Sequence, residues 1–562
     1  MGSKTLTPAS AVFLVLLFGV FAVFLVYPVG YVLESAFYRE GVFTLEFFRL
    51  MFTNPVHREA IINSTMLAIT VTAVTTVIAL PISFVMVRRD FPGKPLLNGL
   101  LLVPMVMPPF VGAVGMQQLL AKFGSVNLLL IRIGLMSPRD PFDWLGTGFW
   151  AVVLLSVLHL YPIMYLNVAA ALANVDPSLE EAGRNMGASG FKLFRSVTFP
   201  LMLPGYFAGA IIVFIWAFTD LGTPLIFNYS RVVPVRIFEA VSDIHENPMG
   251  FALVVLVLAM TVVFFAISKK VLGSSNYQMM ARGHVQGSSS PLPRRWVPVV
   301  WVSIAAVIGC ALIPHASVVL SAIADTWFMT ILPSSYTTVY IGRVFTHPLT
   351  LSSIRNSLFL SSLSTVVDVA LGVTIAYFLA RKRFIGRDVL DGLAMLPLAL
   401  PGLVLAFGYV AAFSGSFLDI KRNPMPLLII AYAIRRLPYM VRAAYAGLQQ
   451  TSETLEEASL NLGAGPLRTL RRITLPLVFA NIVAGSVLAF SFAMLEVSDS
   501  LILAAKEEFY PITKAIYAMS LRVADGPYIA SAMGLLGMVL LATSLIVAGR
   551  FLGKRLGELF RA

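Results

Sequence analysis

The sequence predicts an all-α integral membrane protein with about twelve transmembrane helices, arranged as two tandem six-helix halves. Three observations support this fold class. The 562 residues are 58% hydrophobic and only 12% charged, which is far from the composition of soluble globular domains. Apolar runs of about 20 residues recur along the chain, each long enough to cross a hydrocarbon core of roughly 30 Å. Polar segments of the first half also recur in the second half at matched spacing.

The first half is expected to cover residues 1–272 and the second half residues 296–562. Between them, residues 273–295 are rich in Gly, Ser and Pro, a composition typical of a flexible linker. The expected spans are 9–33, 62–87, 97–121, 147–174, 198–219 and 250–271, then 296–323, 357–380, 389–413, 426–449, 474–495 and 527–551.

The basic residues are distributed as expected for a membrane protein. A net charge of +13 is compatible with a nucleic-acid partner, but Lys and Arg gather in short loops between spans, such as Arg88-Arg89, Lys269-Lys270 and 381–383. These loops fall on one side of the predicted topology, as the positive-inside rule requires. We therefore expect membrane lipid and no nucleic acid around the chain, with the N- and C-termini in the cytoplasm.

One polar segment occurs twice, at residues 176–200 and 452–476, and both copies are expected on the cytoplasmic side. Ten of the 22 positions that begin at Glu180 and Glu456 are identical. Packing between lipid-exposed spans does not explain why the same polar segment occurs in both halves. A partner protein that contacts the chain at two equivalent places would explain it.

Each copy has the signals of a short helix. Asp176 and Ser452 are suited to cap a helix N-terminus, and the glutamates that follow lie in the first turns, where the helix dipole favours negative charge. Gly187 and Gly463 stand where a glycine would end a helix of about ten residues.

The second copy also resembles a known motif. Glu457, Ala458, Gly463, Ile473 and Pro476 are similar to the signature loop of ATP-binding-cassette importer permeases, and the first copy differs by conservative changes. In that family the loop is a coupling helix that docks into a groove on a cytoplasmic ATPase. The resemblance implies an ATPase-coupling role for Glu180, Glu181, Ala182, Gly187, Glu456, Glu457, Ala458 and Gly463.

The same resemblance implies the type I importer fold and a set of partners. These are two copies of a cytoplasmic ATPase, which bind ATP and Mg²⁺, and a periplasmic or lipid-anchored solute-binding protein. The fusion of two six-span halves resembles the ferric-iron type of permease, a group with relatives for thiamine, phosphonates and sugar phosphates. A place in the bacterial inner (cytoplasmic) membrane follows.

The repeat extends beyond the polar loops. Asn63-Ser64 aligns with Asn356-Ser357, and Pro104 and Pro108 align with Pro397 and Pro401. Both halves enter the membrane in the same direction, which disfavours the inverted repeats of many secondary transporters. The halves differ in a longer outer loop, Met116–Gly148, which contains an amphipathic piece at Val126–Ile133 and is present only in the first half.

No enzymatic or metal site is predicted. The sequence has no Gly-x4-Gly-Lys-Ser/Thr loop to hold nucleotide phosphates, and no Cys-x-x-Cys or His-Glu-x-x-His spacing for a metal. We therefore expect this chain to bind no cofactor itself.

Charged residues within spans are the candidates for the translocation path, since their burial in lipid is costly. Asp220 and Glu496 occupy matched positions and are expected to face each other across a pseudo-twofold axis. They either line the path or act as interfacial caps and ion pairs. His159, which matches Arg435 in the repeat, is the corresponding candidate in the first half.

Three arginines in the tenth span are the second group of candidates. Arg435 and Arg442 are seven residues apart and share a helix face, whereas Arg436 points about 100° away. They either attract an anionic solute or pair with Glu496 and Asp499 to hold the bundle.

The expected function is the transmembrane permease subunit of an ATP-driven, binding-protein-dependent importer. Its solute would be ferric iron or an anion such as phosphonate or sugar phosphate, moved by alternating access. The alternative is a secondary transporter or channel driven by an ion gradient, for which a matched polar loop on the cytoplasmic side has no evident use.

Overall fold

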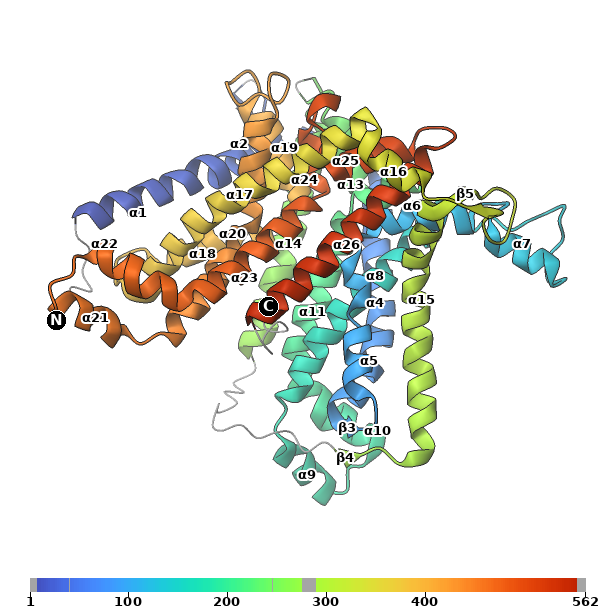
Figure 1. The fold of residues 1–562 in the computed structure, drawn as a ribbon, viewed down its shortest axis with the longest axis horizontal. Coiled ribbons are helices and arrows are strands. Elements are labelled where there is room, and N and C mark those ends of the chain that lie inside the picture. The colour runs from blue at the N-terminus through green and yellow to red at the C-terminus, as the bar shows by residue number, and fades with distance from the viewer. Residues whose placement is uncertain (1–7, 40, 245, 275–289, 553–562) are drawn as a thin grey trace. The chain divides into compact units, whose positions relative to one another are not determined.

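The membrane-crossing segments of the computed structural model are α-helical (Figure 1). The structure describes residues 8–39, 41–244, 246–274 and 290–552. Within these residues, nine helical segments are long and apolar enough to span a membrane, and a bent helix pair adds a tenth. The predicted all-α membrane fold is thereby confirmed. Most of the predicted linker, residues 275–289, and both chain ends lie outside the described residues.

The long helices follow the predicted spans closely at most positions. They are α1 (Pro8–Phe21), α2 (Tyr27–Phe37), α4 (Pro55–Arg88), α6 (Pro109–Leu120), α8 (Phe149–Ala173), α11 (Phe199–Thr219), α14 (Met249–Ser274), α15 (Val297–Ile323), α17 (Pro348–Arg381), α18 (Arg387–Ala399), α19 (Gly402–Phe413), α20 (Met425–Gln450), α23 (Leu475–Met494) and α26 (Gly526–Leu552).

Shorter elements connect them. The short helices are α3 (Glu46–Thr53), α5 (Lys94–Leu100), α7 (Ser125–Arg132), α9 (Pro177–Asn185), α10 (Gly190–Leu193), α12 (Gly222–Ile226), α13 (Val233–Ala240), α16 (Val339–Thr346), α21 (Glu453–Asn461), α22 (Pro466–Thr469), α24 (Ser498–Leu503) and α25 (Ile512–Ser520). Three two-stranded sheets pair β1 (Tyr38–Arg39) with β2 (Val42–Phe43), β3 (Arg89–Asp90) with β4 (Ser290–Pro291), and β5 (Ala324–Thr326) with β6 (Ser335–Tyr336).

Two spans that the sequence predicts as continuous are broken at matched prolines. The expected span 97–121 consists of α5, a 3₁₀ turn and α6, and the expected span 389–413 consists of α18 and α19, which meet at 103°. Pro108 and Pro401 stand directly before α6 and α19 with extended backbone, at ψ 136° and 138°. A proline at this point lacks the N–H that would continue the preceding helix, so the chain turns there.

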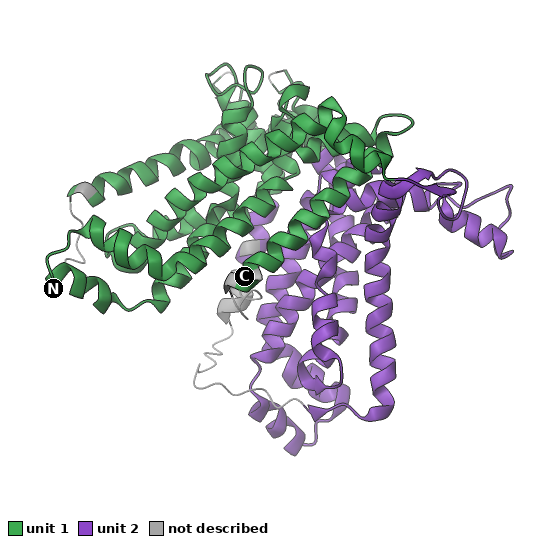
Figure 2. Ribbon diagram, in the orientation of Figure 1, with its two compact units in different colours: residues 1–55, 236–258, 338–559 green, residues 56–235, 259–337, 560–562 purple. Residues whose placement is uncertain are grey.

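The chain forms two compact units that do not coincide with the two sequence halves (Figure 2). Unit 1 comprises Met1–Pro55, Arg236–Leu258 and Thr338–Leu559, and unit 2 comprises Val56–Val235, Ala259–Thr337 and Phe560–Ala562. The first span of each sequence half therefore packs with helices of the other half. The two sequence halves are thus the units of the internal repeat, whereas the two compact units are the groups of helices that pack together.

Close backbone contacts hold these exchanged spans. In unit 1 the Tyr409 hydroxyl of α19 donates to the carbonyl of Phe24 at 2.7 Å, and Gly408 approaches the backbone of Pro28. In unit 2, α15 packs on α6 so closely that a Cβ on Gly115 would lie 2.8 Å from the backbone nitrogen of Val318. Small residues of this kind allow helices in a membrane to approach each other.

The aligned Asn-Ser pairs make the same contacts in both units. Ser64 of α4 accepts a hydrogen bond from the Val233 N–H at 2.8 Å, and Ser357 of α17 accepts one from the Ile512 N–H at 2.7 Å. The preceding asparagines each donate to a carbonyl of the same segments, Asn63 to Arg231 at 3.0 Å and Asn356 to Tyr510 at 3.2 Å. The Asn-Ser pairs that repeat in the sequence thus make equivalent hydrogen bonds in the two units.

Candidate functional site

The two acidic loops fold into helices, α9 and α21, that have the predicted N-terminal caps. The Asp176 carboxylate accepts a hydrogen bond from the Ser178 N–H at 2.9 Å. The Ser452 hydroxyl accepts one from the Thr454 N–H at 3.3 Å. Each cap satisfies an N–H that would otherwise lack a partner in the first helical turn.

The predicted glycine ends are confirmed as well. α9 and α21 end just before Gly187 and Gly463, which have φ of +85° and +86°. Glycine adopts this left-handed conformation without the steric cost that a Cβ imposes. The two loops therefore have the same length and shape.

The first cap is expected to depend on pH, because it uses a carboxylate, whereas the hydroxyl of the second does not titrate in this range. The hydrogen bond from Ser178 lowers the pKa of Asp176 below its ordinary value of 3.8. The stabilisation of α9 is complete above that value and is lost as pH falls below it, because the unfolded loop then binds a proton more readily. We expect amide protection at Ser178, corrected for intrinsic exchange, to hold above pH 3.8 and to fall as the pH drops below it, while protection at Thr454 stays constant. If protection at Ser178 and at Thr454 changed with pH in the same way, the assignment of Asp176 as the cap of α9 would be wrong.

The first glutamate of each pair points inward and ties the loop helix to a membrane helix. Arg88, at the end of α4, donates to Glu180 at 3.0 Å, and the Thr198 hydroxyl donates to the same carboxylate at 2.8 Å. Arg381, at the end of α17, donates to Glu456 at 3.1 Å. Both pairs are largely buried, with Glu180 the more enclosed of the two glutamates. Neither glutamate is displayed on the loop surface, so both are placed to hold α9 and α21 in position.

The outward surface of each loop carries a matched set of apolar side chains. Met186 is 82% exposed and its counterpart Leu462 is 89% exposed, while Phe191 and Leu467 are 75% and 78% exposed. Around them lie the other predicted coupling residues, all exposed: Glu181, Ala182, Gly187, Glu457, Ala458 and Gly463. Large apolar side chains displayed at matched places are typical of a surface that a partner protein or lipid covers.

A buried charge cluster in unit 1 contains two of the three predicted arginines. Arg436 of α20 donates to the Glu496 carboxylate and, at 3.1 Å, to the Phe492 carbonyl. Arg435 lies 3.6 Å from Glu496 and 3.8 Å from Asp499, which is fully buried. The guanidinium of Arg435 occupies the space where a side chain on Gly402 would stand. Ion pairing, one of the two alternatives for these residues, is therefore present.

The third arginine, Arg442, lies apart from this cluster. An additional acid, Asp368, lies near the cluster. Arg442 is exposed and its Nε donates to the Met395 sulfur at 3.1 Å. Asp368 of α17 is buried and interacts electrostatically with Arg436. Sequence reasoning missed Asp368, although a single acid within an apolar span is a signal of buried polar chemistry.

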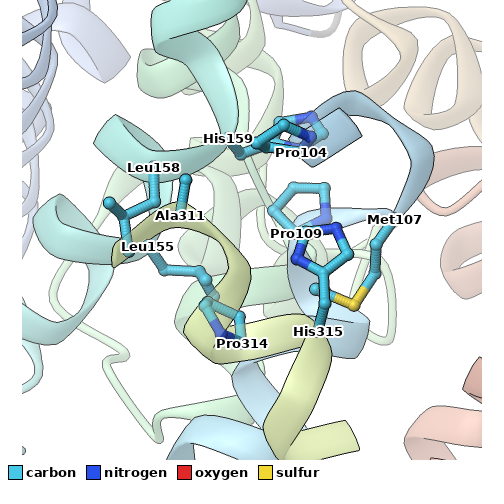
Figure 3. Close-up of a pocket in the computed structure, with 9 residues that line it drawn as sticks. All are labelled: Pro104, Met107, Pro109, Leu155, Leu158, His159, Ala311, Pro314 and His315. Carbon is cyan, nitrogen blue, oxygen red and sulfur yellow. The ribbon is translucent and has the colours of Figure 1, made fainter. Parts of the chain in front are cut away.

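The candidates of the first half have different surroundings. Asp220 accepts hydrogen bonds from the N–H groups of Gly222 at 3.1 Å and Thr223 at 3.4 Å, so it caps α12. It belongs to unit 2 and Glu496 to unit 1, so the expected facing arrangement stays a prediction. His159 lines a pocket of about 10 Å³ in unit 2 with His315, which the sequence analysis did not single out (Figure 3). The rest of the lining is Pro104, Met107, Pro109, Leu155, Leu158, Ala311 and Pro314.

Two similar sets of membrane helices, each with a rigid loop helix held at one end, define an internally duplicated membrane permease. Residues 79–272 and 370–558 each match the family described as binding-protein-dependent transport system inner membrane component. The chain belongs to this family, whose members are translocation subunits. The predicted fused, two-domain importer permease is confirmed.

Similarity to individual permeases covers most of the chain in one case and about a third of it in two others. It is 28% identical over 517 residues to the ferric transport system permease protein FbpB of Actinobacillus pleuropneumoniae, covering 90% of this chain and 72% of that one. It is 32% identical over 192 residues to the molybdate/tungstate transport system permease protein WtpB of Pyrococcus furiosus, covering 34% and 74%. It is 28% identical over 220 residues to the molybdenum transport system permease protein ModB of Escherichia coli, covering 37% and 91%.

Proposed function

We propose that this chain is the transmembrane subunit of an ATP-driven importer and that α9 and α21 each bind one copy of a cytoplasmic ATPase. The observation that carries the proposal is the pair of matched apolar surfaces around Met186 and Leu462. Two equal surfaces on one chain fit two equal subunits. ATP and Mg²⁺ would be bound and used by that partner, and a solute-binding protein would deliver the solute on the opposite face of the membrane.

The buried glutamates supply the mechanical link in this proposal. A loop helix that moves with an ATPase subunit must pass its motion to the membrane helices. Arg88 and Arg381 join α9 and α21 to the ends of α4 and α17, and those helices are tied at their far ends through Ser64 and Ser357. Closure of the ATPases would thus rock long rigid helices and alternate the access to the path.

The orientation follows from the same proposal. The loops lie in the cytoplasm of the bacterial cell, so the chain crosses the inner membrane many times with both termini on the cytoplasmic side. The arginines and lysines of Arg88-Arg89 and 381–383 then lie inside, in accordance with the positive-inside rule.

For the solute, we propose ferric iron bound to an anion, or an oxyanion such as phosphonate or sugar phosphate. Relatives named for ferric iron and for molybdate support this range. Arg435 supports it too, because its side chain is the more accessible of the two arginines in the cluster, although its buried Nη1 already faces Glu496 and Asp499. The planar fork of N–H donors on a guanidinium is suited to bind carboxylate or oxyanion oxygens.

Exchange of Arg435 tests its role. Arg435→Leu is expected to lower uptake per folded permease by about tenfold, which corresponds to roughly 1.4 kcal/mol of lost interaction. Arg435→Lys, which keeps the charge without the planar fork, should retain part of the uptake. The measurement is solute uptake per folded permease. Loss of folded protein in both variants, with normal uptake by what remains, would assign Arg435 to structural pairing alone.

Reconstitution separates the proposal from the ion-gradient alternative. The permease is placed in lipid vesicles with and without the ATPase that co-purifies with it, and uptake is measured with ATP or with an imposed proton or sodium gradient. We expect uptake only with the ATPase and ATP. Uptake driven by a gradient in the permease alone would overturn the proposal in favour of a secondary transporter or channel.

A further inference from the structure

The loop that distinguishes the two halves has no part in the function proposed above. It covers residues 121–148 between α6 and α8 and contains α7, whereas residues 414–424 suffice to join α19 to α20 in the second half. Within unit 2, α7 extends sideways past α15, at the end opposite α9 (Figure 1). By length and composition, α6 and α7 together count as one of the nine candidate spans, Pro109–Arg132, but α7 runs across the direction of α8 and α15.

Internal hydrogen bonds give this loop a fixed shape. Asn127 of α7 is fully buried, and its amide nitrogen donates to the carbonyls of Lys122 at 2.8 Å and Phe142 at 2.6 Å. Its amide oxygen accepts from the Trp144 indole at 2.6 Å. One buried asparagine therefore joins the beginning, the helix and the end of the loop.

The segment between β5 and β6 holds the loop from a second side. Ser125 of α7 donates to the carbonyl of Thr330 at 3.4 Å. Gln118, at the end of α6, donates to the carbonyl of Trp327. Trp327 is buried, and its indole donates to the carbonyl of Thr330 at 3.2 Å. These contacts all lie within unit 2, so the loop and the β5–β6 segment form one platform beside α15.

The outward side of this platform is apolar. Val126, Leu129, Leu130 and Ile133 recur at the spacing of one helix face, and the buried Asn127 lies on the other side of α7. Leu129 and Ile133 are 46% and 57% exposed. Further exposed apolar residues of the platform are Phe123, Leu135, Phe142, Phe328, Met329 and Leu332. A soluble surface rarely displays so many large apolar side chains together.

We infer that α7 lies in the lipid headgroup region and that its apolar stripe enters the acyl chains of that leaflet. Val302, Ile313 and Val319 are exposed along α15, the helix that leads into the β5–β6 part of the platform. Trp150 is exposed at the beginning of α8, and exposed tryptophan at the end of a span is typical of the membrane interface.

The charges of the loop fit the same location. Arg132 is exposed on α7 beside the apolar stripe and Lys122 is exposed before the helix, while the exposed charges after the helix are mixed: Arg139, Asp140 and Asp143. Basic side chains that flank an apolar helix face are typical of helices that lie along a membrane. This inference rests on the membrane fold of the family and is independent of the ATPase proposal. It implies that α7 anchors the first half in one leaflet and offers little surface to a soluble binding protein.

Spin labels on α7 test the inference. Leu129→Cys and Ile133→Cys are made separately in a Cys310→Ser chain, labelled with a nitroxide and placed in lipid nanodiscs with anionic lipid. Arg132→Cys, on the same helix at the edge of the stripe, is the matched control. The measurement is the accessibility of each label to oxygen, which partitions into lipid, and to a water-soluble nickel chelate. We expect the oxygen-to-nickel ratio at 129 and 133 to exceed that at 132 several-fold.

Two results would overturn the inference. Equal ratios at all three positions would place α7 in water. Labels at 129 and 133 that are shielded from both reagents would indicate a protein occupant, such as a second copy of this chain. Since the substituted side chains are exposed, the variants are expected to fold, and Leu135→Cys, at a 74% exposed position, provides an independent site.

Discussion

Replacing Met186 and Leu462 together by glutamate is expected to abolish ATP-driven uptake while the chain stays folded in the membrane. Both side chains are more than four-fifths exposed and make no internal packing contribution that a glutamate would remove. A charge at the centre of a covered apolar surface has to be desolvated without a partner, which costs several kcal/mol at each loop. The measurement is uptake together with the amount of ATPase that co-purifies.

Single and conservative variants serve as controls for this result. Met186→Leu is matched, because position 462 already carries leucine, and it should leave uptake unchanged. Met186→Glu or Leu462→Glu alone should weaken retention of the ATPase less than the double variant does. Normal uptake by the double glutamate variant would show that these surfaces are not the docking sites.

Removal of Arg88 or Glu180 should destabilise the chain by about 3–5 kcal/mol, the usual cost of breaking a buried ion pair from one side. Arg88→Ala leaves the Glu180 carboxylate enclosed with only the Thr198 hydroxyl as a partner. Glu180→Ala leaves the enclosed guanidinium without its acid. Thermal unfolding in detergent measures the effect, and the double variant should cost less than the two single costs together.

The neighbouring glutamate supplies the control. Glu181 is exposed on the same helix, so Glu181→Ala should change stability by no more than about 0.5 kcal/mol. The second loop offers a repeat of the test with Arg381 and Glu456, which are likewise largely buried. If Glu180→Ala and Glu181→Ala behaved alike, the inward role of the first glutamate would be wrong.

The elements defined by local chemistry could be predicted from the sequence. α8 and α20 begin and end within two residues of their expected bounds, because the length of an apolar run sets the length of a span. The caps at Asp176 and Ser452 and the glycine ends of the loops also follow from short-range hydrogen bonding and backbone sterics.

Features that depend on distant partners could not be predicted. Glu180 and Glu181 look equivalent in the sequence, and only the approach of Arg88, 92 residues away, makes the first inward and the second outward. The packing of α15 with the other half has no sequence signal either, since the lipid-facing and buried faces of a membrane helix are equally apolar. Met186 and Leu462 could not be predicted as a displayed pair either, since only the folded loops show which of their apolar side chains stay exposed.

The most direct test of the central claim is a contact measurement at the loops. A photo-crosslinking phenylalanine derivative is introduced at position 186, at position 462, and at the exposed position 135 as a control, in cells that express the whole transporter. The account predicts that positions 186 and 462 both crosslink to a nucleotide-hydrolysing subunit and that position 135 does not. Absence of that crosslink at both loops, together with modification of the loops by a reagent confined to the outside of the cell, would contradict it.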